Sequence, residues 1–479
     1  VEISGFPVSD GLRIDLLHAA VKVIPSQQID TGEDEPLPAI TSVAAIRGLD
    51  EKQDSEALPV KLTGVITYND PDWGQIFFQD STGGIYMKYP GSTALVQGQK
   101  VTVIGITNPG DYAPVVIAPK FILAGGRGSL PHPVAVNATD ASSGILDSQF
   151  VELQGVVHPL KNEESRHLTF ELYSPFGQIH VYTNPTFTGK DQLAPLVDAT
   201  VHAQGIIGTI FNSRRQLVGY QLSISSINDI RVLAPANPDP FQKVITPINH
   251  LLRFSPHADS SHRIKVKGSV TMVGRGFFYL QDETGGVEVQ GDTHSIRPAE
   301  EVEAVGYASA GGGYSPVLID STVHVVGNNT PVAATTVTAE SSSMGQFDSQ
   351  LVTLDGRLIS ILDSSNGKSL ILQAGARTFR AQLDSLDTTQ GLPELTEGSV
   401  LRLTGICSLQ VNPRKIYLIL AQEPISFNIV LRSPADIQIL QHAPWWTAQH
   451  ALFVLGISFL TILVTFVWVT LLRRRVHSQ

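Results

Sequence analysis

The chain contains a tandem duplication, and this repeat is the feature that most limits how it can fold. Residues 64–85 return as residues 268–287, and both copies carry the pattern Gln-Asp-x-Thr-Gly-Gly. Residues 147–155 likewise return as residues 348–356. These matches share an offset of about 200 residues, so a unit of that size has been copied. The two halves of the chain must therefore share one fold.

Short stretches of alternating apolar and polar residues fill both copies, as is typical of half-buried β-strands. Residues 60–66 and 401–405 are examples, and each contains a glycine, which usually marks a bulge or a barrel corner. The Gln-Asp-x-Thr-Gly-Gly pattern suits a hairpin turn, because Asp accepts from nearby backbone N–H groups and Gly tolerates positive φ. This order of strands and turns predicts an all-β chain of small five-stranded, OB-like barrels.

The sequence predicts four such modules, preceded by a half-module and followed by one helix. Residues 1–24 match the second half of a module, so we expect strands there that either need an external partner or pack against the next barrel. No signal sequence is visible at Val1, so we expect the true N-terminus to be missing or processed. The predicted boundaries are 1–45 for the partial module and linker, 58–126, 147–233, 262–327 and 348–440 for the four modules, 445–472 for a transmembrane helix and 473–479 for a basic tail.

An uncharged apolar run at residues 451–472 is long enough to cross a membrane. As a helix, about 22 residues would span about 33 Å. Trp445 and Trp446 precede the run and Trp468 lies near its far end, and tryptophan favours the headgroup layer. A buried core helix is the alternative interpretation of this run.

Three basic residues follow the run at once: Arg473, Arg474 and Arg475. The positive-inside rule places them in the cytoplasm and residues 1–444 outside it. The lone Cys407 allows no intrachain disulfide, which fits a bacterial envelope protein. We therefore expect a single-pass protein of the bacterial inner (cytoplasmic) membrane with a periplasmic N-terminal region.

Charge and motifs exclude several functions. The formal net charge is −11, which argues against nucleic acid as a partner. No nucleophile elbow, zinc-protease motif, phosphate-binding loop or Cys-x-x-Cys pair is present, so we expect no enzyme activity and no cofactor in this chain. His250, His257 and His262 are interpreted as solvated linker residues, with a metal site as the alternative.

Two loops carry candidate ligand or partner contacts. Asp70, Asp72 and Trp73 share one loop, which either contacts carbohydrate or calcium or forms an ordinary turn with an exposed tip. Arg214 and Arg215 form a basic loop tip that either binds an anionic ligand or is a solvated hairpin turn. The copy of the second loop, residues 412–415, is also basic.

Several stretches together identify a resemblance to a known family. Six stretches resemble the periplasmic input region of bacterial membrane sensor kinases, mostly hybrid histidine kinases, and of some diguanylate cyclases. They are residues 65–74, 78–86, 110–115, 211–219, 251–256 and 431–436. Residues 444–447 and 471–476 resemble the junction that leads into the cytoplasmic catalytic domains of these proteins. The resemblance covers about residues 38–479 and implies kinase activity only for a longer parent.

Two functional hypotheses follow from these patterns. The first is an extracytoplasmic sensory array, dimeric or of higher order, that relays binding of an unknown ligand or protein through the helix to a cytoplasmic kinase. The second is a membrane-anchored structural or adhesion protein, whose barrels are spacers and which self-assembles by completing the half-module with a neighbour's strands.

Overall fold

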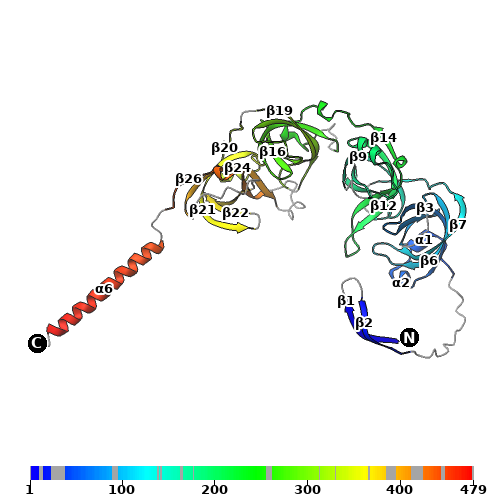
Figure 1. The fold of residues 1–479 in the computed structure, drawn as a ribbon, viewed down its shortest axis with the longest axis horizontal. Coiled ribbons are helices and arrows are strands. Elements are labelled where there is room, and N and C mark those ends of the chain that lie inside the picture. Colours follow the sequence, from blue (N-terminus) through cyan, green and yellow to red (C-terminus); the bar gives the residue numbers. More distant parts are fainter. Residues whose placement is uncertain are drawn as a thin grey trace. The chain divides into compact units, whose positions relative to one another are not determined.

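The computed structural model describes most of the chain and is built almost entirely from β-strands (Figure 1). The prediction of a mostly β chain with one long C-terminal helix is confirmed. The described residues are 2–9, 14–22, 38–88, 95–137, 140, 143–161, 166–175, 177–254, 261–311, 313–328, 331–364, 367–383, 395–411, 424–443 and 448–476.

Modules 1 and 3 are closed five-stranded barrels. In both, the fourth strand pairs back to the first, and the third runs parallel to the fifth. This is the strand order of an OB-type barrel. The strands of module 1 are β3 (Pro59–Asp70), β4 (Gln75–Gln79), β5 (Gly84–Lys88), β6 (Gln99–Asn108) and β7 (Val115–Arg127), and those of module 3 are β15 (Ile264–Val273), β16 (Phe277–Gln281), β17 (Gly286–Gly291), β18 (Glu300–Ser309) and β19 (Val317–Asn328).

Modules 2 and 4 are seven-stranded sheets with the same five-stranded centre. Their first and fourth central strands also pair, and one short strand is added at each edge. Module 2 contains β8 (Val134–Ala135), β9 (Phe150–Lys161), β10 (Thr169–Ser174), β11 (Gly177–Thr183), β12 (Thr200–Phe211), β13 (Leu217–Ile224) and β14 (Ile230–Ala234); module 4 contains β20 (Thr335–Thr336), β21 (Leu351–Ser364), β22 (Gly367–Ala374), β23 (Arg377–Leu383), β24 (Val400–Val411), β25 (Pro424–Leu431) and β26 (Ile437–Gln441).

A glycine inside the first strand forms the corner that closes barrel 1, as the sequence predicts. A Cβ on Gly64 would lie 2.3 Å from the carbonyl oxygen of Gln79, so only glycine lets β3 bend onto β4. The β3–β4 register then shifts between Ile66 and Tyr68, which is the expected irregularity of a bulge.

Short helices close the open ends of the barrels. Helix α1 (Val43–Arg47) inserts Val43 and Ile46 into the core of module 1, and both side chains are fully buried. The helical turn η4 (Ile248–His250) does the same in module 3 with Ile248 and Leu251. The other short helical segments are α2 (Glu51–Asp54), α4 (Lys190–Leu193), α5 (Ala339–Ser342), η1 (Ala194–Leu196), η2 (Ile227–Asp229), η3 (Pro240–Gln242) and η5 (Pro434–Asp436).

The two ends of the chain differ from the modules. Strands lie in residues 1–24 as expected, and they pair with each other: β1 (Glu2–Ser9) and β2 (Ile14–Lys22) form a two-stranded sheet. Helix α6 (Ala448–Val476) contains a stretch, Leu452–Arg474, that is long and apolar enough to span a membrane and is not buried by other parts of the structure described.

The chain divides into two compact units. The first contains module 1 and most of module 2, and the second contains modules 3 and 4 together with two short segments of module 2, Gly155–Pro159 and Ala194–Val201.

Candidate functional site

The repeated Gln-Asp-x-Thr-Gly-Gly motif does more than turn a hairpin. In module 1 the Asp80 carboxylate accepts from the backbone N–H groups of Thr82 and Gly83, and its second oxygen accepts from Val43 N at 2.9 Å. Thr82 Oγ1 accepts from Ala44 N. The turn therefore accepts hydrogen bonds from the free N–H groups at the start of α1 and holds this helix, which plugs the open end of the barrel, in place.

The second copy repeats these contacts at the same positions. Asp282 accepts from the backbone of Thr284 and Gly285 and, through its other oxygen, from Ile248 N at 2.9 Å. Thr284 Oγ1 accepts from Asn249 N at 3.2 Å. The motif thus joins each odd-numbered barrel to its helical plug.

The first residue of the motif joins two barrels. Gln79 Oε1 accepts from Phe150 N, on the first central strand of module 2, at 3.1 Å. Gln281 Oε1 accepts from Leu351 N, on the first central strand of module 4, at 2.9 Å. A small apolar cluster surrounds each bond: Tyr68, Phe77, Phe150 and Ile206 in the first pair, and Met272, Tyr279, Leu351 and Ile406 in the second.

The last residue of the motif is glycine because two backbones approach closely there. A Cβ on Gly84 would lie 1.9 Å from the carbonyl oxygen of Ser148, and a Cβ on Gly286 would lie 2.1 Å from that of Ser349. Both serines have positive φ, 63° and 61°. The sequence predicts a hairpin at this motif, and the structure adds that the hairpin is also the contact between neighbouring modules.

Asp70, a predicted ligand-contact residue, lies inside the first unit rather than at an exposed tip. Its side chain is fully buried, and Oδ1 accepts from the backbone N–H groups of Asp72 and Trp73 at 3.0 and 3.1 Å. Oδ2 lies 2.7 Å from His167 Nε2, on module 2. Asp70 therefore forms the turn that the sequence suggests, but its own side chain is buried against module 2, whereas the tip residues Asp72 and Trp73 are exposed.

The other residues of this loop also face module 2. Asp72 forms an ion pair with Arg166, with an N–O distance of 2.9 Å. The Trp73 ring stacks on His167 at a centroid distance of 3.9 Å and an angle of 6°, yet 43% of Trp73 stays exposed. Sequence reasoning missed His167, because its partner lies 97 positions away and no local pattern marks it.

Of the predicted basic pair, Arg215 is held by module 1 and Arg214 is exposed. Arg215 Nη2 donates to the carbonyl oxygen of Pro109 at 2.9 Å, and its φ of 62° forms the turn. The backbone N–H of Arg214 donates to Asn212 Oδ1. The basic copy of this loop, residues 412–415, lies outside the described residues.

A cavity of about 400 Å³ opens between modules 1 and 2, within the first unit. On the module 1 side it is lined by the outward faces of β4 and β5 and by the loop between β6 and β7; on the module 2 side it is lined by β12 and the turn before β9. Its aromatic walls are two ring pairs: Phe77 with Tyr86 at 5.4 Å, and Tyr112 with Phe211 at 5.8 Å.

The polar lining of this cavity mixes donors and acceptors. Lys88 and Asp111 are exposed at its edge, and Gln75, Asn108 and Gln221 line it as well. Burial, and then the nearby Asp111 carboxylate, raise the pKa of Tyr86. The Thr209 hydroxyl is buried and has no hydrogen-bond partner within the part of the chain that the structure describes. Sequence reasoning named none of these residues.

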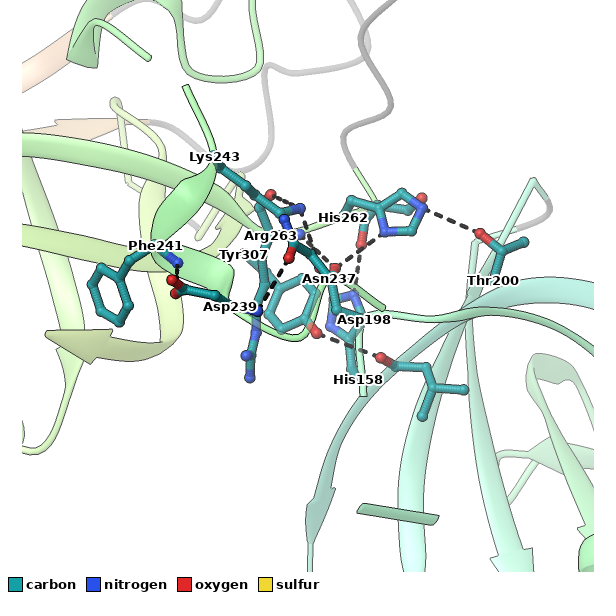
Figure 2. A network of polar contacts seen from close by, with 12 residues as sticks. His158, Asp198, Thr200, Asn237, Asp239, Phe241, Lys243, His262, Arg263 and Tyr307 are labelled. Atoms are coloured by element: carbon teal, nitrogen blue, oxygen red, sulfur yellow. Dashed lines mark hydrogen bonds and ion pairs between the residues drawn. The ribbon is translucent and has the colours of Figure 1, made fainter. Parts of the chain in front are cut away.

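A second polar cluster lies in the second unit, around the buried Asp198 carboxylate (Figure 2). Asp198 Oδ1 accepts from Arg263 N at 2.8 Å and lies 3.1 Å from His262 Nδ1, while Oδ2 lies 3.1 Å from Lys243 Nζ. Burial alone would raise the pKa of Asp198, but the hydrogen bonds from His262 and Arg263 N and the charge of Lys243 together lower it. His262, expected to be a solvated linker residue, is therefore engaged in this cluster, while His257 lies outside the described residues.

Stacked rings extend this cluster. His158 lies on Tyr307 at a centroid distance of 3.5 Å, and His158 Nε2 is 3.0 Å from the carbonyl oxygen of Ser261 (Figure 2). Burial raises the pKa of Tyr307. The hydroxyl of Thr200 lies 3.2 Å from His262 Nε2, so Thr200, His262 and Asp198 follow the order of a hydroxyl–imidazole–carboxylate relay. Lys243 already neutralises that carboxylate, so we interpret the cluster as structural.

The residues described do not gather metal ligands or a reactive thiol. Within them, no group of three or more His, Cys, Asp or Glu side chains could hold a metal ion. Cys407 is buried, as predicted, and burial, followed by the nearby Asp348 carboxylate, raises its pKa to about 12. A thiol in this state is a poor nucleophile at neutral pH.

The predicted membrane-interface residues are only partly described. Trp445 and Trp446 lie outside the described residues. Trp468 is exposed on α6, and Arg473 and Arg474 are exposed in its last turns. Arg475 belongs to the same helix.

Comparison with known proteins identifies no family for this chain. No protein-family description and no curated protein matches this chain. Among solved structures, a murine DNA-binding protein bound to double-stranded DNA is 12% identical, covers 38% of this chain and 98% of its own, and has a TM-score of 0.22. A replication protein A heterotrimer bound to single-stranded DNA is 9% identical, covers 61% of this chain and 94% of its own, and has a TM-score of 0.20. The OB-type assignment rests on the strand order within each module.

Proposed function

We propose that this chain is the extracytoplasmic sensory and interaction region of a single-pass membrane signalling protein. In this proposal the barrels bind a ligand or partner outside the cytoplasm. Helix α6 then passes the resulting displacement to a kinase that is not part of this chain. The observation that carries the proposal is that a helix able to span a membrane follows the last β-module, with six residues of sequence between β26 and α6.

The joints between barrels support a relay. In each pair of modules a side-chain hydrogen bond, a backbone contact that only glycine permits and an apolar cluster hold the barrels together. A displacement of one barrel must therefore move its neighbour or break these contacts, because packed interiors yield little. Such pairs suit two alternative arrangements that a bound ligand can select.

Membrane insertion is the first test. We would express the chain in bacteria with a fluorescent protein after Gln479 and measure how much of it stays in alkali-washed membranes. Leu463→Arg places a charge at the centre of the helix, at a cost of about 2.5–3.5 kcal/mol, and should release the chain. Leu463→Ala is the control. A wild-type chain that is soluble would refute the membrane assignment.

Signal relay is the second test. Joining the chain after Gln479 to a histidine-kinase module with a transcriptional reporter lets a change in the barrels be read in the cytoplasm. We expect Gly286→Ala, which disturbs the joint of modules 3 and 4, to change reporter output at equal protein level, whereas Gly285→Ala should not. Equal output from both variants would refute the relay and leave the barrels as anchored spacers.

Self-assembly is a second candidate function, favoured by β1 and β2. Among the described strands these two pair only with each other, and an isolated two-stranded hairpin is only marginally stable in water. Pairing with another chain would stabilise them by strand addition. Ile3→Pro should then lower the sedimentation coefficient of the full chain. An unchanged sedimentation profile would remove this candidate.

A further inference from the structure

The internal repeat separates the residues that hold two barrels together from those that line the cavity between modules 1 and 2. Structural equivalents are fixed by matching hydrogen bonds: Thr209 N donates to Asp147, and Leu409 N donates to Asp348. The joint residues Gln79, Gly84 and Ser148 have Gln281, Gly286 and Ser349 as their equivalents, so the joint is the same in both pairs.

The cavity lining has diverged at the matching positions. Tyr86, opposite Phe77 on β4, is replaced by Glu288, opposite Tyr279 on β16. The lining also differs at Gln75 and Lys88, which are replaced by Phe277 and Gln290. Three more replacements are Asp111 by Gly313, Thr209 by Leu409 and Phe211 by Val411. The packing of two barrels therefore does not require Tyr86, Asp111, Thr209 or Phe211, and their presence in the first pair needs another explanation.

The position of the cavity points to ligand binding. Its module 1 wall is formed by the second and third strands and the loop before the fifth strand of an OB-type barrel. In this fold those elements form the face that takes oligonucleotides and oligosaccharides. Its volume of about 400 Å³ lies within the range of small-molecule sites.

The lining chemistry separates these two ligand classes. The described lining has a single basic side chain, Lys88, beside two carboxylates, Asp111 and Asp147, so it lacks the excess of positive charge that a phosphate-bearing ligand requires. Asp147 accepts from Thr209 N and lies 3.6 Å from Arg47, which balances its charge. Lys88 and Asp111, both exposed at the edge, then carry opposite charges, which favours neither a strongly cationic nor a strongly anionic ligand.

We infer that the cavity between modules 1 and 2 binds a neutral sugar. The half-buried faces of Tyr86 and Tyr112 offer apolar surfaces for the C–H face of a pyranose ring. Gln75, Asn108 and Asp111 offer the mixed donors and acceptors that ring hydroxyl groups require. The Thr209 hydroxyl, buried without a partner in the residues described, gains one when a ligand hydroxyl enters.

This inference deepens the proposed function by naming the ligand class, and it is tested by binding rather than by signalling. The full chain in lipid nanodiscs, free of glycosidic detergent, is mixed with maltose, cellobiose or N,N′-diacetylchitobiose. Saturation-transfer NMR detects contact and calorimetry measures affinity. Putrescine and inorganic phosphate serve as cationic and anionic probes. We expect at least one of the three disaccharides to bind and neither charged probe to compete.

Variants locate the site. Asp111→Ala removes an exposed side chain, and Tyr86→Glu introduces the residue that the second pair carries, so neither should prevent folding. Each should weaken disaccharide binding about tenfold or more, because a hydrogen bond or a stacking face is lost. Glu288→Ala, at the matching position of modules 3 and 4, should leave affinity unchanged.

Several results would overturn the inference: no disaccharide binds, the affinities of both first-pair variants equal that of the wild type, Glu288→Ala weakens binding as much as they do, or putrescine or phosphate displaces the sugar. A chain that inserts in the membrane and relays a signal, yet fails these binding tests, would refute the sugar site and leave the proposed function standing.

Discussion

Replacing Gly286 by alanine should disrupt the joint between modules 3 and 4. The new Cβ would lie 2.1 Å from the carbonyl oxygen of Ser349 and 2.5 Å from its carbonyl carbon. Both are backbone atoms, so no side chain can rotate away. To restore an ordinary contact the two backbones must separate by roughly 1 Å, which a close-packed interior resists.

The separation has a calculable consequence for the neighbouring hydrogen bond. Leu351 follows Ser349 by two residues, and its N–H donates to Gln281 Oε1 at 2.9 Å. A displacement of roughly 1 Å would stretch that distance to about 4 Å, beyond hydrogen-bonding range. Overpacking costs about 1–3 kcal/mol and an orphaned buried amide costs about 1–3 kcal/mol, together about 2–6 kcal/mol.

Hydrogen exchange of the full chain, followed by mass spectrometry, measures this loss of stability at the joint peptide by peptide. Peptides that contain the start of β21 should exchange at least about 30-fold faster in Gly286→Ala, because the free energy of local opening falls by about 2 kcal/mol or more. Peptides from β3 and β4 in the first unit should be unaffected.

The adjacent glycine supplies a matched control. A Cβ on Gly285 would lie 3.6 Å from Ile248 Cγ2 and 4.0 Å from the backbone nitrogen of Asn249, both ordinary contacts. Gly285→Ala should therefore leave exchange at the joint unchanged, or slow it slightly by lowering the entropy of the unfolded chain. If the two alanine variants exchange alike, the close approach at Gly286 does not hold the barrels together, and the reasoning fails.

Three further predictions concern buried polar groups. Asp70→Ala should lower the free energy of unfolding of the first unit by about 2–4 kcal/mol in denaturant titration, since it removes the acceptor of two backbone N–H groups and a 2.7 Å contact to His167. Asp72→Ala, at a partly exposed ion pair, should change this free energy by less than about 1 kcal/mol. Equal effects of the two variants would contradict the buried role of Asp70. The pKa of Asp198 is lowered in the folded chain, so its stabilising contribution is present above its unfolded pKa of about 4 and is lost as pH falls through the lowered value. Asp198→Asn should therefore remove this acid-dependent loss of stability from unfolding curves measured over a pH series. An unchanged pH profile would contradict the assignment. The Cys407 thiol, with its pKa raised to about 12, should not react with an aromatic disulfide reagent at pH 8 in the folded chain. It should react fully once concentrated guanidinium has unfolded the chain. Rapid reaction of the folded chain would count against the burial of Cys407.

The sequence predicts the fold well because its signals are local. Alternation along β3 and β24, the glycine at position 64 and the Asp-x-Thr-Gly-Gly turns all act over a few residues, and each is present as expected. The five-stranded order follows from repeating that local pattern. The long helix is equally local, since its length and lack of charge suffice to define it.

The site is much less predictable, because its contacts join residues far apart in the sequence. His167 is 97 positions from Asp70, and Arg215 is 106 positions from Pro109. The loop at residues 69–74 has an exposed tip, as its sequence suggests, but the burial of Asp70 against a second module is not visible in the local sequence. The one sequence signal that would have helped is a position-by-position comparison of the two copies, in which cavity residues such as Tyr86 differ from their counterparts, here Glu288, while Gln79 and Gly84 match theirs.

The size of the copied unit has a structural reason. The joint is formed by residues of both barrels: Gln79 Oε1 accepts from Phe150 N, and Gly84 lies against the backbone of Ser148. A single barrel of this type would expose the aromatic rings that now pack between modules, such as Phe77. A pair of barrels is therefore the smallest unit that can be duplicated with its contacts between barrels intact.

Once the pair is fixed, the surface between its barrels is free to vary. The second pair also has a cavity, of about 490 Å³, at its joint, but Tyr314 and Asp348 share that lining with Ile248 and Thr284 rather than with aromatic pairs. The two cavities lie at different positions of the joint, because the counterparts of Ile248 and Thr284, Val43 and Thr82, do not line the cavity of the first pair. The combined variant Tyr86→Glu, Asp111→Gly, Thr209→Leu and Phe211→Val should abolish sugar binding in the first pair without loosening the joint.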